Sequence, residues 1–248
     1  MPAPRCGVLA AWTSTWLAGR AASDEVLRAV STGDEGHRIV ADDAAEMPLS
    51  EALIQWRTRG GNVRAVLPVP GDLRGVPGPV GFRAAALDAG EAVFGGGFGL
   101  VPEILAANPA SSARPYVRWR AFVVEAAPPD DIDVRDAQQA LTEAIRDSAR
   151  ALLAADVSGA SGEVGEVGEA LAHARRAGER LDLPSGYPAR AVALLAQAER
   201  MEDVLRIALL DPVGGAIDRT GVAARTDALR PLVTAVRRAR VAGYNAGG

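Results

Sequence analysis

The pattern of hydrophobic and polar positions changes character near residue 128. Up to about residue 127, helix-like and strand-like patterns alternate with loops rich in glycine and proline, whereas the rest of the chain is nearly all helical. The segment 128–131, Pro-Pro-Asp-Asp, marks the change, because two prolines cannot continue a strand ladder. We therefore predict an α+β fold: a mixed α/β part with a small sheet over residues 1–127, then a helical, bundle-like part over residues 128–248. The sequence leaves open whether the two parts pack as one globule.

The first part is expected to combine short helices with short strands. Trp12 and Trp16 lie four residues apart, on one helical face with Leu9, which predicts an amphipathic packing helix over 7–18. A second helix is expected to begin near Pro48, and paired glycines end it after residue 59. The other expected elements are helices over 23–30 and 81–88 and strands over 63–69, 92–94, 98–101 and 116–125. The polar, acidic stretch 33–47 is expected to be a loop, in which a short strand over 37–40 is the alternative.

The segment 116–125 is the clearest strand of the chain. Val117 and Trp119 alternate with Arg118 and Arg120, so the first half is expected to have one apolar face and one basic face. The second half is apolar on both faces, which predicts that it is buried on both sides, with a helix over one of them.

The second part has the periodicity of helices separated by short breaks. Leu141, Ile145, Ser148 and Leu152 follow the spacing of a seam in an antiparallel bundle. The natural prediction is a four-helix bundle with alanine-rich seams. Its expected helices cover residues 133–156, 169–181, 188–210 and 222–244.

The composition excludes several kinds of chemistry. The 248 residues carry a net charge of −4, and all 27 basic residues are arginine. Without lysine there is neither a Walker A phosphate loop nor a Schiff base on the chain, so pyridoxal phosphate cannot be attached covalently. One cysteine and two histidines make a Cys/His zinc site hard to build, and one thiol cannot hold an iron–sulfur cluster. We expect no cofactor and no metal.

The composition also bears on location and partners. Arginine in place of lysine, with abundant alanine, is typical of a GC-rich bacterial genome. No stretch reaches the roughly 18 consecutive apolar residues of a transmembrane helix, and the N-terminus lacks the pattern of a signal peptide. We therefore expect a cytoplasmic protein that does not contact membranes. The net acidic charge and the lack of a recognition motif argue against nucleic acid as a partner.

The loop 71–79 is the first candidate for a binding site. It follows a strand that is expected to be buried, and ligands of open α/β sheets bind beyond the carboxyl ends of strands. Asp72 and Arg74 are its only charged residues, and its glycines would let a ligand approach the backbone. The alternative interpretation is a rigid connector in which Asp72 and Arg74 pair with each other.

Arg118 and Arg120 are the second candidate. They point to the same side of one strand, about 7 Å apart by the rise per residue, and could clamp a phosphate or carboxylate. They could equally pair with acids of a neighbouring strand or be solvated. His37 is expected to lie exposed in a polar loop and His173 on a helix surface, so neither is favoured as a general acid or base.

Two functions are compatible with these features, and no complete catalytic motif is present. The favoured one is a non-catalytic protein-interaction or scaffolding module, with the alanine-rich bundle and an exposed Trp/Leu helix over 7–18 as surfaces for a protein partner or for self-association. The alternative is a binding protein or enzyme for a small anionic ligand, held by Asp72, Arg74, Arg118 and Arg120. The sequence identifies no catalytic residue and leaves open whether the protein is an enzyme.

Overall fold

The structure is a computed structural model that describes residues 3–41, 45–105, 114–125, 130, 132–154, 181–210 and 219–248. The chain divides into two compact units. The sheet unit comprises Pro2–Asp131 with Asp182–Pro188 and Tyr244–Gly248, and the helical unit comprises Ile132–Leu181 with Ala189–Gly243. A sheet in one unit and helices in the other confirm the predicted α+β class.

The sheet unit is built on one six-stranded sheet with the order β2-β1-β6-β5-β4-β3. Only β1 and β6 run parallel to each other, and the other neighbouring strands are antiparallel. Two glycines with positive φ, Gly96 and Gly97, form the tight turn of the predicted hairpin between β4 and β5. The strands are β1 (Gly36–Val40), β2 (Glu46–Pro48), β3 (Arg64–Val66), β4 (Ala92–Gly95), β5 (Phe98–Leu105) and β6 (Tyr116–Val123).

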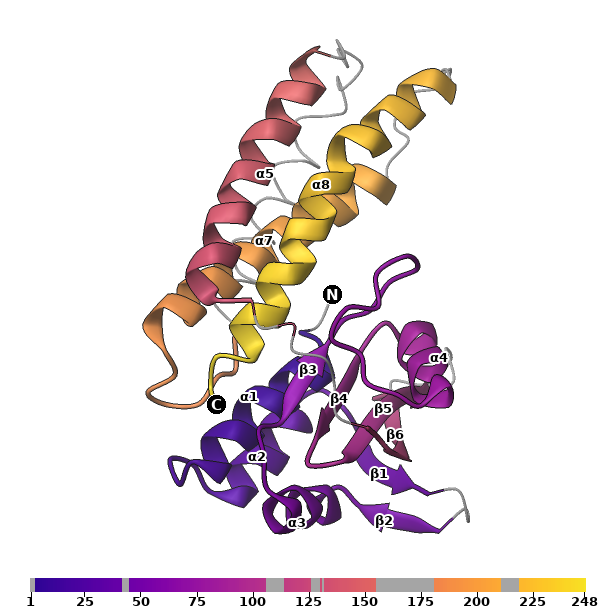
Figure 1. Cartoon of the computed structure of the whole chain (residues 1–248), viewed down its shortest axis with the longest axis vertical. Coiled ribbons are helices and arrows are strands. Elements are labelled where there is room, and N and C mark those ends of the chain that lie inside the picture. Colours follow the sequence, from indigo (N-terminus) through magenta and orange to yellow (C-terminus); the bar gives the residue numbers. More distant parts are fainter. Residues whose placement is uncertain are drawn as a thin grey trace. The chain divides into compact units, whose positions relative to one another are not determined.

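Helices cover the two faces of the sheet unequally. Helices α1 (Arg5–Leu17), α2 (Ser23–Val30) and α3 (Ser50–Arg59) lie on one side of it, and α4 (Val80–Ala89) lies on the other (Figure 1). Val123, near the end of β6, is 77% exposed, so the prediction that the second half of this strand is buried on both sides is wrong.

Helix α1 is buried on all sides, which corrects the prediction of an exposed Trp/Leu surface. Every residue from Cys6 to Trp16 is buried, because the helix packs against α2 and against β3, β4 and β5. Two of its polar side chains bond to other segments of the unit: the Ser14 hydroxyl donates to the carbonyl of Val63, and the Trp12 indole N–H donates to the carbonyl of Asp182.

The helical unit contains α5 (Val134–Ala154), α7 (Ala189–Leu210) and α8 (Arg219–Tyr244) among the described residues. Leu141 of α5, Leu194 of α7 and Val236 of α8 lie in one fully buried cluster. The expected helix over 169–181 falls almost wholly outside the described residues. No helix in the described part is long and apolar enough to cross a membrane.

Residues from the end of the chain complete the sheet unit. Strand β3 is an edge strand, and the Asn245 side chain lies against it like one residue of a further strand. Its Oδ1 accepts from the Ala65 N–H at 2.8 Å, and its Nδ2 donates to the Ala65 carbonyl at 2.9 Å. The Tyr187 hydroxyl donates to the carbonyl of Tyr244. The tail therefore blocks part of an edge that would otherwise be free to pair with another chain.

Asn245→Ala removes both of these bonds and leaves two backbone groups of β3 without their partner. We expect the free energy of unfolding to fall by about 1–3 kcal/mol, because unsatisfied part-buried polar groups are costly. Urea denaturation measures this. Asn62→Ala is the control, since Asn62 is exposed and makes no hydrogen bond with the described residues; equal losses in the two variants would contradict the role of Asn245.

Candidate functional site

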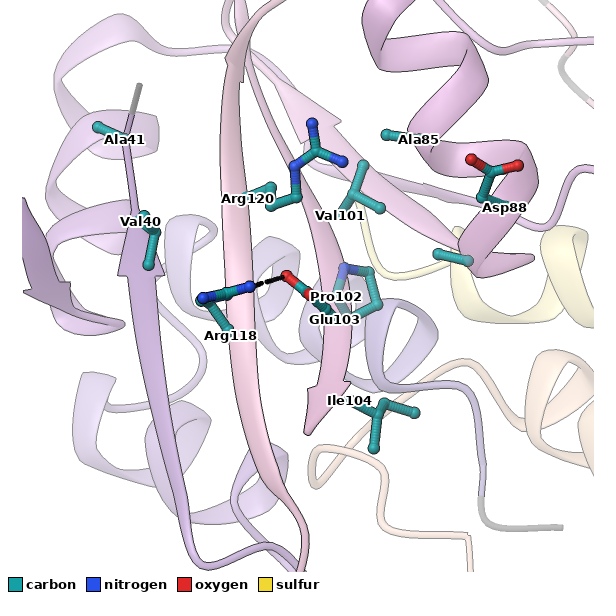
Figure 2. A pocket seen from close by; sticks show the side chains of 11 residues that line it. Val40, Ala41, Ala85, Asp88, Val101, Pro102, Glu103, Ile104, Arg118 and Arg120 are labelled. Atoms are coloured by element: carbon teal, nitrogen blue, oxygen red, sulfur yellow. Dashed lines mark hydrogen bonds and ion pairs between the residues drawn. The ribbon is translucent and has the colours of Figure 1, made fainter. Parts of the chain in front are cut away.

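An open pocket of about 810 Å³ lies on the face of the sheet that carries α4. Residues from β1, α4, β5 and β6 line it, as Figure 2 shows. Its charged lining residues are Asp88, Glu103, Arg118 and Arg120, and the other lining residues are all apolar. Its volume is in the range of small-molecule sites.

Strand register explains why these charges meet. Glu103 of β5 lies opposite Arg118 of β6, and Val101 lies opposite Arg120. Successive side chains of a strand point to opposite faces. Trp119, between Arg118 and Arg120, therefore points to the other side of the sheet, where it is fully buried. Helix α4 packs on the pocket side through Phe82, whose ring contacts that of Phe122 with a centroid distance of 5.5 Å.

Arg118 is paired with the acid of the neighbouring strand. Its Nε and Nη2 both donate to Oε2 of Glu103, at 2.9 and 2.7 Å. Their side chains are 39% and 41% exposed, so this ion pair is solvated and contributes little to stability.

Arg120 has no acidic partner among the described residues. Its guanidinium carbon lies 5.2 Å from the centroid of the Phe122 ring, and the residue is exposed in the pocket. A third arginine, Arg38 of β1, lies beside Arg118 in the parallel register and so belongs to the same face of the sheet. The Nη1 of Arg38 donates to the carbonyl of His37, in a long bond of 3.3 Å.

The structure does not bring the loop 71–79 to this pocket. Asp72 and Arg74 pair with each other: Nε and Nη2 of Arg74 donate to the two carboxylate oxygens at 2.8 and 2.7 Å. This hydrogen bonding raises the pKa of the Arg74 guanidinium. The loop follows β3, an edge strand antiparallel to its only neighbour, so the rule for the carboxyl ends of parallel strands does not apply to it.

His37 is buried in β1 rather than exposed in a loop, which corrects the prediction. Its side chain lies on the face covered by α1, where Trp119 donates its indole N–H to Nδ1 at 3.0 Å. Its Nε2 lies 3.2 Å from Oδ2 of Asp34, without the alignment of a good hydrogen bond. Both Asp34 oxygens accept from the Arg5 guanidinium, at 2.6 and 2.7 Å.

This cluster keeps His37 neutral. A nitrogen that accepts from Trp119 cannot carry a proton itself, so the single proton of the ring sits on Nε2, facing Asp34. Burial lowers the pKa of His37 below its ordinary value, although the Asp34 carboxylate opposes this. The network joins residues on the sheet face that α1 covers, and it offers no exposed group for catalysis.

The other residues considered for chemistry are also unfavourable. Burial raises the pKa of the Cys6 thiol well above its ordinary value, so the reactive thiolate is suppressed. Among the described residues no three His, Cys, Asp or Glu side chains are arranged to hold a metal ion. His173 lies outside the described residues.

Two family models together match nearly the whole chain. One, for the N-terminal domain of Rv1486c-like proteins, matches residues 6–134, and the other, for the C-terminal domain of the same proteins, matches residues 135–241. The chain belongs to this family. It is 29% identical to the uncharacterized protein Rv1486c of Mycobacterium tuberculosis (strain H37Rv), over 96% of this chain and 95% of the relative. The uncharacterized protein ML1804 of Mycobacterium leprae is 27% identical over the same shares.

These family relations place the chain among bacterial proteins and carry no activity with them. No solved structure matches the chain. The function therefore has to be argued from the pocket.

Sequence patterns do not single out Asp88 and Glu103 as pocket residues, or Arg38 as a neighbour of Arg118. Alternation along β5 puts Glu103 beside apolar neighbours, but no local signal says that β5 pairs with β6. Asp88 is one of many helix acids, and only the position of α4 over the sheet makes it a pocket residue.

His37→Asn should remove an acid-sensitive part of the stability. Below about pH 6.5 the unfolded chain binds a proton that buried His37 does not, so the free energy of unfolding falls with decreasing pH. The slope from one such group is at most about 1.4 kcal/mol per pH unit. Asparagine keeps an oxygen that accepts from Trp119 but does not titrate.

Urea denaturation at pH 7.5, 6.5 and 5.5 measures the difference. We expect the decline to be smaller in His37→Asn than in the parent chain. His173, the second histidine, is present in both and cancels from the comparison. Identical declines would contradict the assignment of a neutral buried His37.

Proposed function

We propose that the sheet unit binds a small anionic ligand, a carboxylate or a phosphate, in the pocket between α4 and β6. The observation that carries the proposal is Arg120, a guanidinium in a pocket of metabolite size without an acidic partner among the described residues. Guanidinium groups present a planar fork of donors that matches carboxylate and phosphate oxygens.

Aromatic packing supports Arg120 in the pocket. The Phe122 ring lies under its guanidinium, and Phe122 in turn packs edge to face against Phe82 of α4. Phe82 is fully buried and also contacts Phe94. The cation–π contact therefore orients Arg120 without neutralising it, which leaves its donors free for a ligand anion.

Arg118 would supply a second set of donors. Its partner Glu103 is solvated, and exchanging one carboxylate for another in a solvated ion pair changes the free energy little. A ligand anion at Arg120 could therefore also contact Arg118, with Glu103 turning to solvent. Without a ligand, Glu103 pairs with Arg118 and so limits the repulsion between Arg118 and Arg120.

The protein-interaction role loses one of the two surfaces on which it rested. Leu9, Trp12 and Trp16 were to form an exposed helix face, and all three are buried in α1. Most large apolar side chains in the described part of the helical unit are covered by packing between the helices. Val233, which is 38% exposed, is the exception there. We therefore favour the ligand-binding alternative over the scaffold.

Arg120→Ala should weaken anion binding by about tenfold to hundredfold, the range for losing charge-assisted hydrogen bonds. The measurement is calorimetric titration of the full chain with inorganic phosphate and with succinate, at constant ionic strength because salt screens exposed charges. Arg74→Ala is the matched control, because Arg74 is an exposed arginine of the same unit outside the pocket. The Arg74→Ala variant should bind both anions as tightly as the parent chain does.

Glu103→Gln should change the anion affinity in the opposite direction. Losing the carboxylate frees Arg118 and removes a negative charge from the pocket, so anion affinity should rise several-fold. A gain of affinity on removing an acid is not expected from general damage to the fold. The proposal is wrong if Arg120→Ala binds as the parent chain does, or if Arg74→Ala weakens binding as much.

A further inference from the structure

We infer that the ligand of this pocket is dipolar, with an ammonium group that Asp88 holds while Arg120 holds the anionic group. This inference rests on the proposed function and adds the second charge of the ligand. The starting observation is that the pocket carries a second charged side chain, of opposite sign, that forms no ion pair within the described residues.

Asp88 stands on the wall of the pocket, in the last turn of α4, whereas Arg120 stands on its floor in β6 (Figure 2). Both side chains are exposed. The two do not pair with each other: neither has an ion pair in the described part of the chain. The pocket therefore has a negative pole and a positive pole that are kept apart.

The end of α4 strengthens the negative pole. The carbonyl groups at the C-terminus of a helix carry partial negative charge, so an aspartate there is unfavourable unless a cation is near. The last turn of α4 contains no basic residue, and the helix ends at Gly90 in the left-handed conformation. Asp88 and the helix end together form a site for a cation, and a bound ammonium group would relieve the repulsion between them.

The surface between the poles is apolar. Ala85 and Ala89 of α4 and Val101 of β5 line the pocket together with Asp88 and Arg120, and their short side chains leave room for a ligand. A fitting ligand thus has an anionic group, a short hydrocarbon part and a protonated amine, as in an amino acid or an aminoalkyl phosphate. A purely anionic ligand would leave Asp88 and the helix end uncompensated.

The test compares two probes that differ only in the amine, 5-aminopentanoate and pentanoate, titrated into the full chain by calorimetry. The parent chain should bind 5-aminopentanoate at least several-fold more tightly. Asp88→Asn should abolish this preference and leave pentanoate affinity unchanged or slightly higher. Arg120→Ala should weaken both probes. Asp24→Asn, an exposed helix aspartate of the same unit, is the matched control and should keep the preference.

The outcomes separate the two proposals. If pentanoate and inorganic phosphate bind through Arg120 but the amine gives no preference, or if Asp88→Asn keeps the preference, the dipolar ligand is wrong and anion binding stands. If neither probe nor phosphate binds the parent chain, both proposals fail.

Discussion

The burial of α1 is the constraint on which the sheet unit depends. A helix without a solvent-exposed face needs internal partners for its polar groups, and the surrounding elements supply them for Trp12 and Ser14. Ser14 reaches the segment before β3, and Arg5 at the start of the helix pairs with Asp34, beside the neutral His37 that accepts from Trp119. These contacts join the helix to β1 and β6, the two parallel neighbours in the sheet.

The inward position of Trp119 determines which side chains of β6 lie on the opposite face of the sheet. Strand alternation then places Arg118 and Arg120 outward, in a register that sets Glu103 beside Arg118 and leaves Arg120 over Phe122. Because α4 covers only part of that face, the arginines line an open pocket rather than a core. The structural network on one side and the charged pocket on the other are thus two consequences of the same strand.

How far the sequence predicts this arrangement depends on whether a feature is local. The alternation in β6, the glycine hairpin between β4 and β5 and the helix ended by Gly60 were predictable because each signal lies within a few residues. The pairing of Glu103 with Arg118 was not, since it depends on which strands are neighbours. For the same reason the sequence does not show that the loop with Asp72 and Arg74 follows a strand at an antiparallel edge of the sheet.

Local patterns predicted burial as poorly as they predicted which strands pair. Leu9, Trp12 and Trp16 on one helical face made α1 look amphipathic, yet the hydroxyl groups of Ser14 and Thr15 are also buried, because each donates to a carbonyl nearby. His37 was placed in a loop because its neighbours are polar, and only the partners Trp119 and Asp34, one of them far along the chain, show why it is inside.

The central claim is that the pocket at Arg120, and not the loop at Arg74, receives the anion. The most direct measurement is a crystal structure of the full chain soaked in selenate, a tetrahedral anion whose selenium can be located by its anomalous scattering. The account predicts an anomalous peak within hydrogen-bonding distance of the Arg120 guanidinium, between β6 and α4. A peak at Asp72 and Arg74, with none in the pocket, would contradict it.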